Sequence, residues 1–135
     1  MAERTLDRIH RVRTLQLTLA RAEEARAHAQ VATEQALSAR IAQLADAVAP
    51  VSGSAVTLLA ASHYRDRLSK SAQAAVDRVR QAETEAARAV DGARAAKRDQ
   101  SAVEKLIKRA RAEALRREMR ALEDAPATRK RHGPC

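Results

Sequence analysis

The fold is decided by residues 56–124, which read VTLLAASHYRDRLSKSAQAAVDRVRQAETEAARAVDGARAAKRDQSAVEKLIKRARAEALRREMRALED. This stretch contains no proline and a single glycine, Gly92. A continuous helix of that length would extend for roughly 100 Å, whereas a compact domain of this chain length has a radius of gyration of about 14 Å. The stretch therefore predicts a rod, and the residues before it predict a second, shorter arm that folds back along it.

The composition is that of a long helix or coiled coil. Of the 135 residues, 45% are hydrophobic and 32% are charged; Trp and Phe are absent, and Tyr64 is the one aromatic residue. Abundant Ala, Arg, Glu and Leu at helical spacing indicate one elongated domain. Such a chain lacks the large side chains of a wide core, so we expect two helices joined by a narrow, alanine-lined seam. Its small buried area predicts marginal stability, which a partner that binds only the folded form would raise.

A break signal separates the two helical segments. Pro50 disfavours helix at the residue before it, and Gly53 permits a tight reversal. We predict a first helix over about residues 5–48 with Thr5 near its N-cap, a turn over 49–55, and a second helix over about 56–124 capped by Ser52 or Ser54. Residues 1–125 would then form an all-α, elongated antiparallel two-helix coiled-coil hairpin with a longer second helix. Residues 126–135 are predicted to be a basic, disordered tail.

Each helix carries apolar residues at steps of three and four, which predicts a coiled-coil seam with small shifts along it. In the first helix these residues are Leu15, Leu19, Ala22, Ala25, Ala29, Ala32 and Ala36, followed after a shift of one residue by Leu37, Ile41, Leu44 and Val48. In the second they are Leu68, Ala72, Val76, Val79, Ala82, Ala86, Val90, Ala93, Val103, Ile107, Ala110 and Ala114, followed after another shift by Leu115, Met119 and Leu122.

The two arms differ in length, so we expect the residues beyond about 100 to overhang the paired region. Two features weaken the second helix. Gly92 costs about 1 kcal/mol relative to alanine, and the segment Ser101–Glu104 has the form of a capping box, which allows a kink or a restart there.

Charge is concentrated at one end of the predicted rod. The formal net charge is +9, and residues 94–135 hold 13 basic and 6 acidic side chains, which gives +7. Such an end attracts an acidic protein surface, nucleic acid or anionic lipid. It lacks the aromatic side chains that stack on single strands and any helix-turn-helix or basic-zipper pattern, which argues against nucleic acid. A solvated face without a partner is an equal alternative.

No catalytic or metal-binding constellation is visible, so we expect neither enzymatic activity nor a cofactor. The sequence has no glycine-rich phosphate loop and no HExxH motif, and its four histidines lack ligand spacing. A single cysteine, Cys135, forms no internal disulfide. The start of the sequence has no apolar segment typical of a signal peptide, and no apolar run is long enough to span a membrane.

The turn end of the hairpin is depleted of charge. From Ile41 to Tyr64 only Asp46 carries a formal charge, if His63 is neutral. A two-helix rod has no third layer to cover Leu58, Leu59 and Tyr64, so some of them should be exposed. Exposed apolar patches often mark docking sites, and an aromatic residue is a natural anchor. Simple packing at the turn is the alternative.

Three segments of the second helix resemble the FliJ family of the flagellar type III export apparatus, whose injectisome relatives are the YscO-type stalk proteins. Tyr64-Arg-Asp-Arg-Leu68 is similar to the aromatic-x-x-x-Leu start of that family's second helix. Val103-Glu-Lys-Leu-Ile-Lys-Arg-Ala-Arg-Ala-Glu-Ala-Leu-Arg-Arg-Glu118 is similar to its "LEKL…R…E…RRE" segment. Met119-Arg-Ala-Leu-Glu-Asp-Ala125 is similar to its acidic and apolar ending.

This resemblance implies a soluble, cytoplasmic stalk, peripherally associated with the membrane at the base of a flagellum or an injectisome. The stalk would couple a hexameric export ATPase to a membrane export gate protein and assist export chaperones, with no small-molecule substrate. The implied gate contact comprises Leu37, Ile41, Leu44, Val48, Tyr64, Leu68, Ser71 and Ala75. The implied ATPase contact comprises the start of the first helix together with Arg109, Arg116, Arg117 and Arg120.

Two other functions fit the residues without the resemblance. The net charge of residues 94–135 fits a coiled coil associated with nucleic acid, whose affinity would fall steeply with salt. The periodicity alone fits a structural coiled coil that associates with itself.

Overall fold

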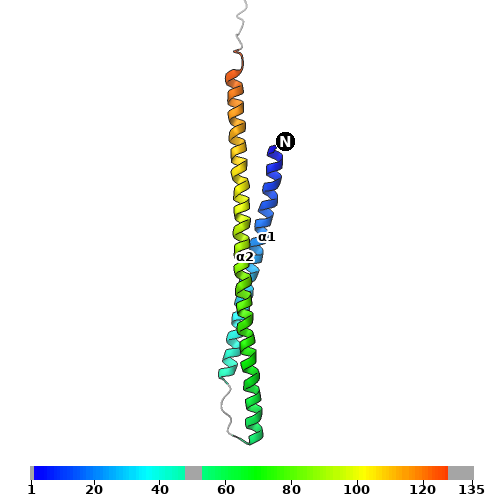
Figure 1. Ribbon diagram of the computed structural model, residues 1–135, viewed down its shortest axis with the longest axis vertical. Helices are drawn as coiled ribbons and strands as arrows, with labels where there is room; N and C mark the ends of the chain where they lie inside the picture. The colour runs from blue at the N-terminus through cyan, green and yellow to red at the C-terminus, as the bar shows by residue number, and fades with distance from the viewer. Residues whose placement is uncertain (1, 48–52, 128–135) are drawn as a thin grey trace, which may run out of the picture.

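The computed structural model describes residues 2–47 and 53–127, which form two long helices lying side by side (Figure 1). Helix α1 spans Ala2–Asp46 and α2 spans Ala55–Asp124. The described ranges contain no strand. The predicted all-α hairpin with a longer second helix is therefore confirmed. Val48, which was predicted to end the first helix, residues 49–52 of the predicted turn, and residues 128–135 of the predicted tail lie outside the described residues.

The helix ends follow from local chemistry. Helix α1 begins at Ala2, so Thr5 lies inside the helix and is not its N-cap. Of the two predicted caps for α2, Ser54 has the extended conformation of an N-cap, with φ −61° and ψ 161°. The backbone N–H of Thr57 donates to Ser54 Oγ at 3.5 Å, which satisfies one of the free amides of the first turn. At the other end Ala125 is extended, as expected for a residue before proline.

The seam of α2 follows an unbroken heptad. Its buried or half-buried residues are Leu68, Ala72, Ala75, Val79, Ala82, Ala86, Ala89, Ala93, Ala96, Gln100, Val103, Ile107 and Ala110. Most of the predicted positions are confirmed, but Val76 is 37% exposed. The predicted continuation through Ala114, Leu115, Met119 and Leu122 is wrong, because these residues lie exposed beyond the end of the paired region. The strict alternation of steps of four and three contains no shift, as in a left-handed coiled coil.

The predicted seam of α1 is largely wrong. The residues that face α2 are Leu6, His10, Arg13, Leu17, Ala20, Glu24, Ala27, Val31, Glu34, Ser38, Ile41 and Ala45, again in an unbroken heptad. Leu15 and Leu19 are 65% and 64% exposed, and of the predicted positions within residues 2–47 only Ile41 belongs to this heptad. Alanines occur all around α1, so the pattern of apolar residues did not reveal which face is buried.

Polar contacts between the helices fix their antiparallel register. Four pairs join them directly: Glu34–Arg78 at 3.2 Å, Arg13–Asp99 at 3.2 Å, His10–Glu104 at 3.2 Å and Glu3–Arg111 at 3.9 Å. Gln100 Nε2 also donates to Thr14 Oγ1 at 3.1 Å, inside the seam. As the α1 member of these pairs moves toward the start of α1, its partner on α2 moves by a nearly equal number of residues toward the end of α2.

The overhang of α2 is shorter than predicted. Pairing continues to Arg111, and Val103 and Ile107 are buried under the first turns of α1. The overhang therefore comprises residues 112–124, all of them exposed, and does not begin near residue 100.

Helix α2 runs without interruption through both of its predicted weak points. The restart allowed by the capping-box pattern does not occur, and the Glu104 carboxylate lies 3.2 Å from His10 Nε2 on α1. Gly92 has a negative φ, and a Cβ built on it would meet nothing within 4 Å.

Replacing Gly92 by alanine is expected to stabilise the hairpin by about 0.5–1 kcal/mol, because alanine removes the entropic cost of glycine at an open helical position. Urea denaturation followed by circular dichroism measures the change. The matched control is Ala102→Gly, at an exposed position of the same helix, which should destabilise by a similar amount. A loss of stability in Gly92→Ala would contradict the open environment seen at this residue.

Replacing Leu17 by alanine is expected to destabilise the hairpin by about 2–4 kcal/mol, because Leu17 is 4% exposed and its removal leaves a cavity in a thin seam. Leu15→Ala removes the same atoms from an exposed position and should cost less than about 1 kcal/mol. The same denaturation experiment compares the two variants. Equal losses of stability in the two variants would contradict this prediction, because they would mean that Leu15 contributes as much to packing as Leu17 does.

Candidate docking surfaces

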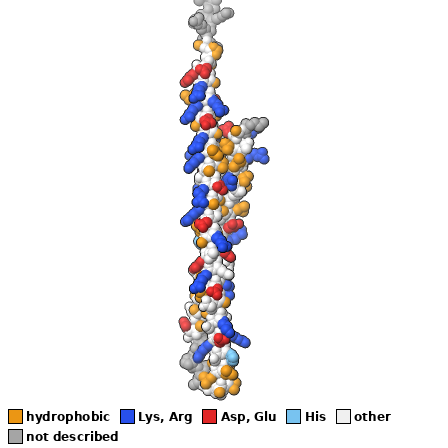
Figure 2. Space-filling model, viewed as in Figure 1, with side chains coloured by type: hydrophobic (Ala, Val, Ile, Leu, Met, Phe, Trp, Pro, Cys, Tyr) orange, Lys and Arg blue, Asp and Glu red, His pale blue; other side chains and the backbone are white. Residues whose placement is uncertain are grey.

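The start of α2 projects past the end of α1 (Figure 1). The register sets Ala45 opposite Leu68, so residues 55–67 lie beyond α1; we call this segment the tip. The tip exposes the large apolar side chains of Val56 (78%), Leu58 (51%), Leu59 (61%) and Tyr64 (51%). Figure 2 shows hydrophobic side chains gathered at this end of the rod. The predicted exposure of the turn end is confirmed.

The residues of the implied gate contact do not form one surface. Ile41 and Leu68 are half-buried in the seam, and Ala75 is completely buried, which removes it from contact with any partner of the closed hairpin. Leu37 and Leu44 are 43% and 50% exposed on the flank of α1. The remaining members of the set are Tyr64, which belongs to the tip, Ser71, which is exposed, and Val48, which is outside the described residues.

A line of basic residues follows α2 on the side turned away from α1. It comprises Arg98, Lys105, Arg109, Arg116 and Arg120, at alternating steps of seven and four; we call it the basic stripe. All five are exposed, and none of them has an ion pair among the described residues. Figure 2 shows Lys and Arg side chains along one edge of this half of α2.

Three of the four residues of the implied ATPase contact lie in the basic stripe: Arg109, Arg116 and Arg120. Arg117 is exposed about 100° around the helix from Arg116, so it faces another side. Glu113 lies between Arg109 and Arg116 beside the line of the stripe, and Glu123 lies on that line one turn beyond Arg120. The stripe is therefore a strong but not uninterrupted surface for an anionic partner.

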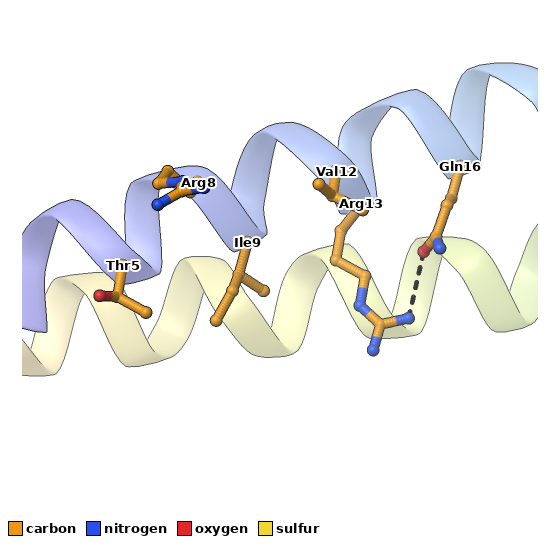
Figure 3. A pocket seen from close by; sticks show the side chains of 6 residues that line it. All are labelled: Thr5, Arg8, Ile9, Val12, Arg13 and Gln16. Atoms are coloured by element: carbon orange, nitrogen blue, oxygen red, sulfur yellow. Dashed lines mark hydrogen bonds between the residues drawn. The ribbon is translucent and has the colours of Figure 1, made fainter.

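Sequence reasoning missed a third surface, on the outer face of α1. Ile9, Val12, Leu15 and Leu19 are 40%, 53%, 65% and 64% exposed; we call them the outer strip. Beside it lies an open hollow lined by six residues that all come from α1: Thr5, Arg8, Ile9, Val12, Arg13 and Gln16 (Figure 3). Arg13 Nη1 donates to Gln16 Oε1 at 3.1 Å across one edge of this hollow. A strict heptad that includes Leu6 and Leu17 runs along the seam face of α1, and this pattern in the sequence would have distinguished the seam face from the outer face.

Within residues 2–47 and 53–127, no group of His, Cys, Asp and Glu side chains is arranged to hold a metal ion. Over the same residues, neither helix has a segment that is both long and apolar enough to cross a membrane. The hollows lie on the outside of the two helices and are wide open. The arrangement offers surfaces for macromolecules.

Comparison of the chain with protein-family models, with curated proteins and with solved structures gives no match.

Proposed function

We propose that the chain is a coiled-coil stalk of a type III protein export apparatus, which couples a hexameric export ATPase to a membrane export gate protein and assists export chaperones. One observation carries the proposal: α2 extends past α1 at both ends, and the two extensions differ in chemistry. The tip presents Val56, Leu58, Leu59 and Tyr64. The other extension continues the basic stripe through Arg116 and Arg120.

The length of α2 supports a bridging role. Its 70 residues correspond to roughly 105 Å at 1.5 Å per residue. Two binding sites separated by that distance engage two partners at once without steric conflict. A rod with one functional end would not need exposed apolar residues at the other.

The chemistry of each end suits a different partner. The tip offers aliphatic side chains around one tyrosine, which is the composition of an anchor that buries itself in an apolar pocket of a protein. The basic stripe offers unpaired cations in a straight line, which suits the acidic lining of a ring or groove. The resemblance assigns the first partner as the export gate and the second as the ATPase ring.

Association with nucleic acid is the second candidate, and the basic stripe is the observation that favours it. Five exposed cations in a line would release counterions from a phosphate backbone. The stripe contains no aromatic residue for base stacking, however, and Glu113 lies beside it. We therefore rank this function below the export stalk.

Replacing Arg116 and Arg120 by glutamate is expected to weaken binding to the cognate export ATPase at least about tenfold and to abolish stimulation of its ATP hydrolysis, because two charge pairs become repulsions. The matched control is Arg65→Glu with Arg67→Glu, an equal charge change at exposed positions of the tip. Hydrolysis assays and sedimentation of the ring with each variant measure the effect.

Three outcomes would contradict this assignment. The first is the absence of any binding or stimulation by the unmodified chain at micromolar concentration. The second is an equal loss in the control variant, which would indicate a net-charge effect alone. The third is a duplex DNA affinity that falls steeply with salt and disappears in Arg116→Glu with Arg120→Glu while ATPase binding persists; this would favour the nucleic-acid function.

Replacing Leu58 by serine and Tyr64 by alanine is expected to abolish binding to the cytoplasmic domain of the export gate while leaving ATPase stimulation unchanged, because both side chains are half-exposed at the tip. Leu115→Ser with Met119→Ala is the matched control at the opposite end, where these two side chains are 58% and 54% exposed. Calorimetric titration against the gate domain measures both variants. Unchanged gate binding in the tip variant would refute a role for the tip.

A further inference from the structure

Three of the four residues of the outer strip lie on the side of α1 opposite the seam, and Ile9 lies at its flank, about 80° around the helix from Leu17. Val12, Leu15 and Leu19 are five residues before, two before and two after Leu17, the buried residue of α1. At 100° per residue each of the three points roughly 140–160° away from Leu17. The first half of α1 therefore has two apolar faces, and α2 covers only one of them.

The uncovered face is the more apolar of the two. Over residues 9–22, the seam face of α1 contains His10 and Arg13 beside Leu17 and Ala20. A helix with one partner turns its more apolar face inward. Here the aliphatic side chains face outward, and a contiguous exposed apolar patch of this kind marks an interaction site.

Basic residues surround the outer strip. Arg4, Arg8, Arg11 and Arg26 lie on or beside its line, all of them exposed and without an ion pair among the described residues. Glu23 is the one carboxylate at its edge. Arg8 and Arg26 stand at its two ends, so the apolar part is limited to Ile9 through Ala22, which is roughly 20 Å of helix.

We propose that the outer strip binds an amphipathic, acidic helix of another protein, which places leucine-like side chains on the strip and carboxylates against the surrounding arginines. Helix-in-groove recognition uses apolar anchors at steps of three and four over two or three turns, which is the spacing of the outer strip. The open hollow at Ile9 and Val12 would receive one such anchor. This inference does not depend on the export function.

Charge distinguishes this occupant from a second copy of the chain. The chain carries +9, and the base of the rod combines Arg4, Arg8 and Arg11 with the basic stripe. Two copies joined through the outer strip would bring like charges together, which opposes association. A bilayer is also a poorer occupant, because the strip has no aromatic residue for the interface and arginines stand at both its ends.

A direct test uses the full chain and a labelled synthetic peptide of about five helical turns, with leucine at the a and d positions of each heptad and glutamate at the e and g positions. Fluorescence anisotropy should give a dissociation constant in the micromolar range. The double variant Leu15→Ser, Leu19→Ser should weaken binding at least about tenfold. Arg8→Glu with Arg11→Glu should do the same, and a peptide with lysine in place of glutamate should not bind.

The matched control is Leu115→Ser with Leu122→Ser, which removes two leucines that are 58% and 77% exposed on the overhang. Circular dichroism should show unchanged helicity in every variant, because all the altered residues are exposed. No binding of the acidic peptide up to millimolar concentration would overturn the proposal, as would equal losses in the control and in the outer-strip variant.

Either of two further results would overturn the proposal by showing that the outer strip binds something other than an acidic helix. One is a dimer in sedimentation that dissociates in Leu15→Ser, Leu19→Ser, which would assign the strip to a second copy. The other is binding to phosphatidylglycerol vesicles that displaces the peptide and depends on the same two leucines, which would assign it to a membrane surface.

Discussion

The hairpin depends on a thin seam between two long helices. On α2 the most deeply buried residues are largely alanines, among them Ala75, Ala82, Ala86 and Ala93. Small side chains let the helix axes approach closely, but each removes little apolar area from water, so hydrophobic burial alone gives weak discrimination between neighbouring registers. The larger buried residues, Leu17, Val103 and Ile107, cluster near the start of α1.

Polar contacts supply the specificity that the alanines lack. Gln100 is 8% exposed and donates to Thr14, so a slip of the register would leave a buried amide without its partner. Glu34–Arg78 and Arg13–Asp99 impose the same alignment farther along the rod. Because these contacts fix the register, they also fix how far α2 projects at each end. The contacts in the middle of the rod thus determine which residues of α2 are exposed in the tip and in the overhang.

The fold and, in outline, the tip and the basic stripe could be predicted from the sequence, whereas the orientation of α1 was missed. The seam of α2 was recognisable because Leu68, Val79, Val103 and Ile107 recur on one face. In α1 alanines occur on all sides, and Leu15 and Leu19, which are as large as the buried Leu17, face solvent. Hydrophobic periodicity therefore pointed to the wrong face. The buried face is selected by His10, Arg13 and Glu34, whose partners on α2 are apparent only once the helices are paired.

Leu15 and Leu19 face outward although burial would stabilise each side chain by about 1.5–3 kcal/mol. An α1 rotated about its axis to bury them would expose Leu6, Leu17 and Ile41, which lie on the face that α2 now covers. The same rotation would break the contacts of His10, Arg13 and Glu34 and carry Arg8 and Arg26 toward the alanine seam, where a charge without a partner is costly. The buried apolar residues and the polar contacts of the seam thus act together to keep Leu15 and Leu19 outward. A partner that covers these two leucines would stabilise the closed hairpin by mass action.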